Sequence, residues 1–229
     1  MLKIFPFIFV VLWSSAFITT KPIIDNSDPF TALAFRFALV AFGFFLFSIY
    51  SKQKILVSKK YFFESFLSGV LLGFAGAGLV LGFDIGSKIP VDGLIATIIA
   101  LLSITFSTLW QKKLSNNLPL SVNNMNQALG GCLFHLIIII LFVDPYIDFS
   151  QTFIIAMSHQ IFLVSFGAFT ILMYLIKHNS ASKTVSIFFL IPATSAFMAW
   201  LFLNESLTNL DLIGFLITSI GVYIATRDQ

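Results

Sequence analysis

Long apolar runs dominate this 229-residue sequence, and only short polar stretches separate them. Most runs approach the roughly 20 residues that a helix needs to cross the hydrocarbon core of a bilayer. Helices satisfy their own backbone hydrogen bonds in lipid, whereas porin-like strands are short segments of alternating polarity. We therefore expect an all-α polytopic membrane protein with about eight transmembrane helices. The expected spans are residues 4–20, 30–50, 63–83, 92–111, 124–143, 153–176, 184–203 and 209–226.

The composition argues against a water-soluble domain. Charged residues make up 10% of the chain, against roughly 25% in soluble domains. The first apolar run follows Lys3 and has the length of a secretory signal, but seven further runs favour an uncleaved helix. The single cysteine, Cys132, lies inside an expected span, so a disulfide framework is not expected.

The distribution of charge along the chain indicates how the helices are oriented. If the N-terminus is cytoplasmic, ten Lys and Arg residues fall in cytoplasmic segments and two in outer segments. The acidic residues show the reverse bias, with two inside and eight outside. The positive-inside rule predicts this asymmetry. We therefore expect a multi-pass protein of the cell (inner) membrane with both termini cytoplasmic. The excess of basic over acidic residues reflects this orientation and does not indicate a nucleic-acid partner.

Three pairs of segments resemble one another in the same order along the chain. The segment "PFTALAFRFAL" (29–39) aligns with "PLSVNNMNQAL" (119–129), so that Arg36 falls opposite Asn126. A similar match joins "SAFITTK" (15–21) to "STLWQKK" (107–113). In the third pair, "SGVLLGFAGAGLVLG" (68–82) and "IGFLITSIGVYIATR" (213–227), each segment carries two glycines seven residues apart.

These matches predict an inverted repeat with a shortened first half. Spans one, two and three resemble spans four, five and eight, and the first half is shorter by about two helices with their loops. Because the first span starts inside and the fourth starts outside, the two halves have opposite orientations. We therefore expect a 3 + 5 arrangement, with three helices in residues 1–83 and five in residues 92–226.

The motifs "LWSSAFITTK" (12–21), "PFTALAFRF" (29–37) and "LIPATSAFMAWLFLNESL" (190–207) resemble EamA-type transporters of the drug/metabolite transporter superfamily. That family has ten helices in two inverted five-helix repeats. The resemblance implies a secondary transporter, a permease or exporter, that moves small metabolites such as amino acids by alternating access. An earlier counterpart of the third motif is absent after "FRF", so two helices of the first repeat are missing. A non-transporting relative, acting as an assembly partner or a remnant, stays open.

Three polar residues inside expected spans are candidates for substrate binding. Arg36 lies within the second span, where a guanidinium binds a carboxylate bidentately or else extends to the interface. Asn126 and Gln127 occupy the matching position of the second half. Their amides either line the same cavity or form hydrogen bonds between helices.

Two further residues within the spans have a functional and a structural interpretation. Trp13 lies in the first span, where its ring either lines the cavity or packs between helices. Pro192 lies in the middle of the seventh expected span and removes one backbone hydrogen bond there. A broken helix of this kind marks either a binding site or a packing kink.

Three residues are candidates for gating or coupling. Lys21 and Glu205 lie at outer ends of expected helices, where they form a gate or anchor the helices at the interface. His159 lies within the sixth span and is a candidate for proton coupling, since unperturbed histidine titrates near pH 6.5. A histidine among apolar neighbours also serves as a purely structural residue.

The remaining motifs limit the function classes and the partners. Three scattered histidines and one cysteine do not make an ordinary metal site, so we expect no metal and no cofactor. No Walker loop and no constellation of catalytic residues is recognisable, so we do not expect an enzyme. Gly69 with Gly73, and Gly78 with Gly82, are small-xxx-small pairs that allow close helix contact and are compatible with a homodimer.

Overall fold

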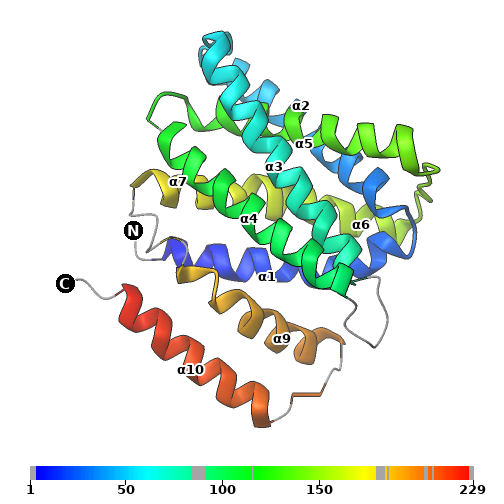
Figure 1. The fold of residues 1–229 in the computed structure, drawn as a ribbon, viewed down its shortest axis with the longest axis vertical. Helices are drawn as coiled ribbons and strands as arrows, with labels where there is room; N and C mark the ends of the chain where they lie inside the picture. Colours follow the sequence, from blue (N-terminus) through cyan, green and yellow to red (C-terminus); the bar gives the residue numbers. More distant parts are fainter. Residues whose placement is uncertain are drawn as a thin grey trace. The chain divides into compact units, whose positions relative to one another are not determined.

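The computed structural model describes residues 4–83, 91–114, 116–178, 184, 186–203, 206–207 and 209–226. Within these ranges the chain forms eight helical segments, one of which joins α6, η1 and α7 without a break (Figure 1). They are α1 (Phe5–Ile24), α2 (Pro29–Tyr50), α3 (Lys59–Phe83), α4 (Val91–Leu114), α5 (Leu120–Phe142), α6 (Gln151–His159), η1 (Gln160–Ala168), α7 (Phe169–His178), α9 (Leu190–Leu203) and α10 (Asn209–Thr226). The predicted all-helical class is confirmed.

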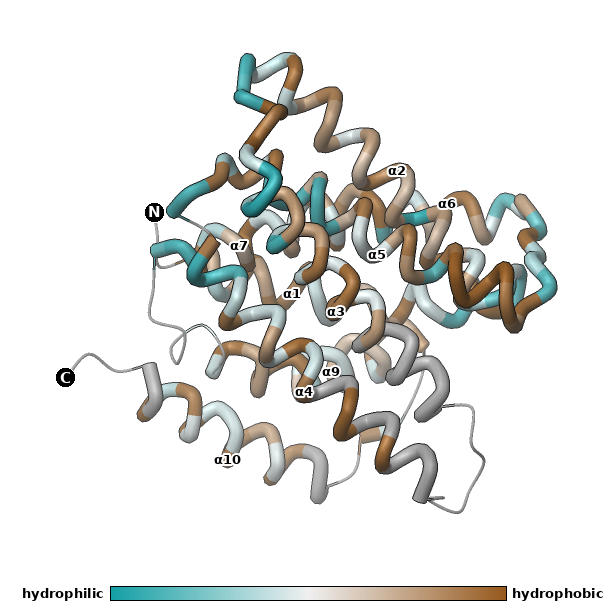
Figure 2. The backbone as a smooth tube through the Cα atoms, turned by 45° about the horizontal axis from the view of Figure 1, so that its top comes forward, coloured by the Kyte–Doolittle hydropathy of each residue, from teal (hydrophilic) through white to brown (hydrophobic). Residues whose placement is uncertain are grey.

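Four of the helical segments are long and apolar enough to cross a membrane. They are α1, α2, α5 and the continuous segment Gln151–His178, with mean hydropathies between 1.7 and 2.1. With 25 and 24 residues, α3 and α4 are also long enough to span. Figure 2 shows apolar colour along most of the helices and hydrophilic colour mainly at their ends and in the loops. The chain is a polytopic membrane protein.

The helices group into two compact units. Unit 1 comprises Met1–Asp25 with Gln151–Gln229, and unit 2 comprises Asn26–Ser150. In unit 1, α1 packs against α6, η1, α7 and α9, and α10 packs against α9. In unit 2, α5 packs against α2 and α3, and α3 packs against α4. This grouping follows spatial packing and differs from the sequence repeat of 1–83 and 92–226, which stays a prediction.

Proline residues mark the starts of α2 and α5. Pro29 is the first residue of α2, where its fixed φ suits a helix and its missing N–H is not needed. The side chain of Asp28 caps this helix by accepting a hydrogen bond from the Thr31 backbone N–H at 2.8 Å. Pro119 is the N-cap residue of α5. The two prolines that the repeat alignment paired therefore both lie at helix starts.

Helix α5 begins at Leu120, four residues before the expected span at 124. All eight residues from Ser121 to Ala128 are buried, and most of them are polar. Hydropathy alone placed residues 121–123 before the span and residues 124–128 at its start. The earlier start occurs because other helices of unit 2 surround this half of α5 and supply hydrogen-bond partners for part of it.

The seventh expected span, 184–203, is interrupted. The continuous helix α9 starts only at Leu190, after a turn at residues 188–189. Pro192 therefore lies in the first turn of α9, and the prediction that it lies in mid-helix is wrong. A proline ring clashes with the carbonyl group four residues earlier, which here belongs to Phe188. The proline thus explains where the helix breaks, although it does not lie at the break.

The segment η1 is a nine-residue π-helix between α6 and α7. Its wider hydrogen-bond pattern continues at its end, where the backbone N–H of Phe169 donates to Val164, five residues earlier. π-Helical turns are rare and occur often at functional sites. The apolar sequence of residues 160–168 gave no indication of this irregularity.

Lys52 has a positive φ of 52° in the turn that ends α2. The backbone N–H groups of Lys52 and Gln53 donate to Ile49 and Ser48 at 3.0 and 2.9 Å, which is the Schellman pattern. Glycine is preferred at such a position, so Lys52→Gly is expected to stabilise the fold by about 0.5–1 kcal/mol. Thermal unfolding in detergent measures the gain. Gln53→Gly is the control, because Gln53 has no positive φ, and an equal gain there would contradict this explanation.

Candidate functional site

A buried hydrogen-bond network joins three helices of unit 2. Asn123 of α5 accepts a hydrogen bond from Ser65 of α3 at 2.7 Å and donates one to Gln111 of α4. The amide nitrogen of Gln111 donates to Ser68 at 2.7 Å, and the hydroxyl groups of Ser68 and Ser107 lie 2.8 Å apart. Each of these bonds connects side chains on different helices.

This network explains how unit 2 tolerates so many polar groups in its interior. All five side chains are buried, with at most 1% of their surface exposed. Hydrogen bonds between membrane helices contribute about 0.6–2 kcal/mol each. Our sequence analysis missed the roles of Ser65, Ser68 and Ser107. Their helical spacing, at i, i+3 in α3 and i, i+4 to Gln111 in α4, was the available signal.

Glycines allow α3 and α5 to approach closely. A Cβ atom on Gly69 would overlap the backbone carbonyl of Gln127, and one on Gly130 would overlap that of Phe66. A Cβ atom on Gly73 would lie 3.3 Å from the Cα atom of Gly131. The prediction of close contact at Gly69 and Gly73 is confirmed. The side chains around Gly78 and Gly82 lie outside the described residues.

Asn126 lies in this same buried half of α5, with 1% of its surface exposed. Neither its amide nitrogen nor its amide oxygen has a hydrogen-bond partner among the described residues. Leaving a buried polar group unpaired costs about 1–3 kcal/mol, and Asn126 has an unpaired donor and an unpaired acceptor. Such groups are uncommon in native structures and indicate a functional role or an external partner.

Arg36 lies on α2, and the contacts of its neighbours show which part of α5 it lies beside. The rings of Phe30 and Phe37 lie 6.3 and 5.5 Å from that of His135, and the Asp28 backbone N–H donates to the Tyr146 carbonyl. These contacts place Arg36 approximately level with His135. Asn126 precedes His135 by nine residues, which corresponds to about 13 Å along a helix. The contacts of Phe37 therefore place Arg36 nearer to the level of Gly131 and His135 than to that of Asn126.

His135 is fully buried in unit 2. Its Nδ1 atom lies 2.7 Å from the Gly131 carbonyl oxygen, so Nδ1 carries a proton and donates it. The rings of Phe30, Phe37 and Phe134 surround the imidazole. Its Nε2 atom has no partner among the described residues. The enclosure by aromatic rings favours a packing role for His135.

A second polar cluster lies in unit 1, between α1 and the start of η1. The two ring nitrogens of His159 lie 3.1 Å from the Ser15 hydroxyl and 3.3 Å from the Thr19 hydroxyl. The amide nitrogen of Gln160 donates to the Ala16 carbonyl at 2.9 Å and to Thr19 at 3.0 Å. The π-helix begins at Gln160, so the irregular backbone and the polar cluster coincide.

Of the remaining predicted residues of unit 1, Trp13 and Pro192 lie beside the break before α9. The Trp13 ring packs against Phe9 and Phe188 with centroid distances of 5.3 and 5.9 Å. The adjacent Ser14 donates to the carbonyl of Ile191 at 3.3 Å. This bond supports the backbone beside Pro192. Lys21 is exposed in the last turn of α1, and Glu205 lies outside the described residues.

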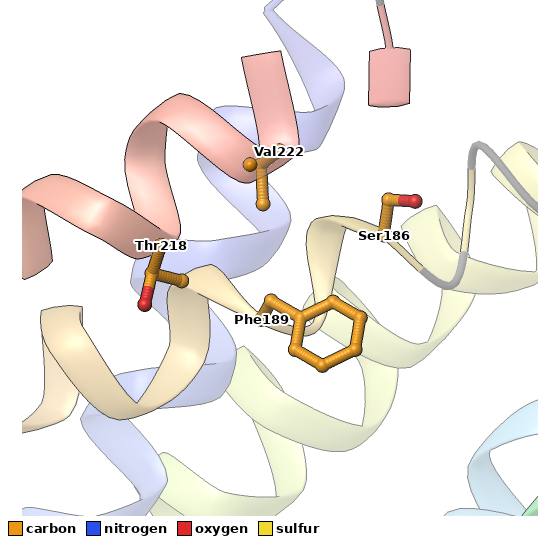
Figure 3. Close-up of a pocket in the computed structure, with 5 residues that line it drawn as sticks. Ser186, Phe189, Thr218 and Val222 are labelled. Atoms are coloured by element: carbon orange, nitrogen blue, oxygen red, sulfur yellow. The ribbon is translucent and has the colours of Figure 1, made fainter. Parts of the chain in front are cut away.

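The same break borders a cavity of about 290 Å³ in unit 1. It is lined by Ser186 and Phe189 on one side and by Thr218, Gly221 and Val222 of α10 on the other (Figure 3). Its wall is mostly apolar and carries two hydroxyl groups. The sequence gave no signal for this cavity, because it depends on how α10 diverges from the interrupted helix.

Helices of membrane-spanning length that enclose buried polar clusters define a polytopic membrane protein. Residues 91–227, well over half of the chain, match the EamA-like transporter family model. The chain therefore belongs to the EamA-like transporter family. This confirms the resemblance to EamA-type members of the drug/metabolite transporter superfamily.

Two individual proteins are similar to this chain. The chain is 27% identical over 160 residues to "Uncharacterized transporter YvbV" of Bacillus subtilis (strain 168), which covers 65% of this chain. The present chain spans about half (49%) of the length of that relative. A solved structure titled "Crystal structure of protein" matches 98% of this chain and 96% of its own, with a TM-score of 0.75 and 14% identity. That likeness shows a shared fold.

Proposed function

We propose that this protein is a secondary transporter of small polar metabolites, such as amino acids, that acts by alternating access in the cell membrane with both termini inside. Membership of a transporter family supports the class. The observation that carries the substrate chemistry is Asn126, a buried amide whose donor and acceptor both lack a partner within the described residues. A polar metabolite carries both complementary groups.

The site that we propose lies in unit 2. Asn126 binds the substrate directly, and the neighbouring Gln127 contributes its backbone to the close crossing with Gly69. Arg36 binds a carboxylate of the substrate as it enters or leaves, because it lies at another level of the same unit. Trp13, Pro192, Lys21 and Glu205 belong to unit 1 and are not part of this proposed site.

Counterflow in proteoliposomes tests this function. Purified protein is reconstituted with an internal pool of unlabelled amino acids, and entry of labelled amino acids is followed. Selective, saturable entry is expected from the wild type, with a loss of at least about tenfold in Arg36→Ala if a bidentate ion pair to the carboxylate is removed. Leu216→Ala is the matched control, because Leu216 is 65% exposed on α10.

A second candidate function is that of a non-transporting assembly partner or remnant. The observation that favours it is that no earlier counterpart of the motif at residues 190–207 follows "FRF" (35–37). This alternative predicts no counterflow from protein that is folded by its thermal unfolding curve. It also predicts counterflow from the full-length relative in the same assay. That pair of results contradicts our proposal.

A further inference from the structure

Lysine side chains gather at the end of unit 2 where α2 ends and α3 begins. Lys52 and Lys54 lie in the connecting segment, and Lys59 and Lys60 are the first two residues of α3. Lys113 lies in the last turn of α4. All five side chains are exposed. We call these five residues the lysine surface.

The buried network of unit 2 shows that lysines from different helices share this end. Asn123 of α5 bonds to Ser65 of α3 and to Gln111 of α4, so these two side chains lie near one level. Lys60 precedes Ser65 by five residues, about 8 Å along a helix, and Lys113 follows Gln111 by two. Because α3 and α4 run in opposite directions (Figure 1), both lysines lie beyond this level on the same side.

Few negative charges balance the lysine surface. Residues 50–66 and 110–125, which include this end of each helix of unit 2, carry six lysines and one acidic residue, Glu64. Their net charge is therefore +5. Lysine clusters beside a membrane helix attract anionic lipid headgroups, which carry the complementary charge.

The start of α3 adds to the attraction for an anion. The first turn of a helix has a positive partial charge, which stabilises acidic residues and anions and destabilises basic residues. The first turn of α3 has no acidic residue and begins with Lys59 and Lys60. The two lysines therefore lower the stability of this helix unless an anion lies beside them.

An apolar segment separates the two lysine pairs of the connection. It comprises residues 55–57 (Ile-Leu-Val), and the Leu56 side chain is 86% exposed. Tyr50, the last residue of α2, is exposed to the same extent. Tyrosine is enriched at the interface between membrane and water, and transfer of an exposed leucine out of water is favourable. These features are typical of a segment that lies at the lipid interface.

One face of α3 continues from the lysine surface into apolar surface. Phe63, Phe66, Val70 and Phe74 follow Lys59 at the spacing of a single helix face. Phe63 and Phe74 are 61% and 41% exposed. Lys59 and Phe74 lie about 22 Å apart along the helix. This exceeds the roughly 15 Å that the acyl chains of one leaflet occupy.

We propose that the lysine surface binds the headgroup of an anionic phospholipid. The lysine ammonium groups contact the lipid phosphate, Leu56 inserts between the acyl chains, and the chains lie along the Phe63 face of α3. Charged and apolar contacts adjoin each other in this order, which matches a lipid and not a soluble anion. The proposal concerns the outer surface of unit 2 and does not rest on the proposed transport function.

Lipid binding to the purified protein tests the proposal without any transport. Native mass spectrometry measures the affinities for phosphatidylglycerol and for phosphatidylcholine with the same acyl chains. The wild type is expected to prefer phosphatidylglycerol. In the double variant Lys59→Gln/Lys60→Gln, the affinity for phosphatidylglycerol is expected to fall about 25-fold, since each lysine near an anionic lipid surface contributes about fivefold.

Lys21→Gln is the matched control, because Lys21 is an exposed lysine at a helix end of unit 1. It is expected to leave the affinity for phosphatidylglycerol unchanged. Thermal unfolding without added lipid checks that each variant is folded. Equal affinities of the wild type for the two lipids overturn the proposal, and so does an unchanged affinity for phosphatidylglycerol in the folded double variant.

Two further measurements separate a lipid from a soluble anion. Leu56→Ser removes an exposed apolar side chain and no charge, so it is expected to weaken binding of phosphatidylglycerol about tenfold through lost apolar contact. Inorganic phosphate at the same concentration as the lipid is expected not to displace it. Full displacement by phosphate, or unchanged binding in Leu56→Ser, shows that the surface binds anions without regard to their acyl chains and contradicts the proposal.

Discussion

Asn126→Leu is expected to abolish counterflow and to raise the thermal stability of the protein. The leucine side chain has the same number of non-hydrogen atoms and the same branching, with methyl groups in place of the amide oxygen and nitrogen. It also removes an amide whose nitrogen and oxygen have no partner among the described residues. The free energy of unfolding is expected to rise by about 1–3 kcal/mol, because that is the cost of leaving a buried polar group unpaired. Counterflow is expected to fall to the level of protein-free liposomes.

Asn123→Leu is the matched control for this prediction. Asn123 lies one turn earlier on α5 and is equally buried, but its amide is part of the network with Ser65 and Gln111. Its replacement leaves the Gln111 oxygen without its donor, so stability is expected to fall by about 1–3 kcal/mol. Opposite changes in melting temperature for the two variants are the result expected. If Asn126→Leu lowers stability as Asn123→Leu does, Asn126 has a structural role.

Gly69→Ala is expected to disrupt unit 2. The added Cβ atom would overlap the carbonyl of Gln127 and lie 2.6 Å from its C and Cα atoms. These are backbone atoms, so no side-chain rotation relieves the overlap and α3 must separate from α5. The free energy of unfolding is expected to fall by about 3 kcal/mol or more, which is the upper end of the range for overpacked sites. Thermal unfolding in detergent, followed by size-exclusion chromatography, measures the effect.

The glycine that the repeat alignment placed opposite Gly69 supplies the control. A Cβ atom on Gly214 of α10 meets nothing within 4 Å. Gly214→Ala is therefore expected to be neutral or to stabilise α10 by up to about 1 kcal/mol, through helix propensity alone. Similar losses at both glycines would contradict the close crossing of α3 and α5.

The sequence predicted the helices well and their irregularities poorly. Apolar length alone placed all eight segments, because the bilayer imposes a minimum helix length. The early start of α5 and the turn at residues 188–189 were missed because both depend on neighbours. Hydropathy measures a residue in isolation and does not register that Asn123 has Ser65 and Gln111 as partners.

The same limit applies to the candidate sites. Asn126 was singled out because an alignment placed it opposite Arg36, but its lack of a partner became visible only in the packed helix. His159 was a candidate as an ionisable residue within a span. Its contacts with Ser15 and Thr19 connect residues about 140 positions apart in the sequence. No local pattern predicts that pairing, because it depends on how α1 packs against α6.

The polar half of α5 also bears on how the chain enters the bilayer during synthesis. The first two turns of α5 partition poorly into lipid alone, because they carry Ser121, Asn123, Asn124, Asn126 and Gln127. Its partners, Ser65 of α3 and Gln111 of α4, precede it in the chain and leave the ribosome first. Helix α5 can therefore enter against a polar surface that is already in place. The buried hydrogen bonds of this half of α5 can then form only where α3 and α4 lie beside it.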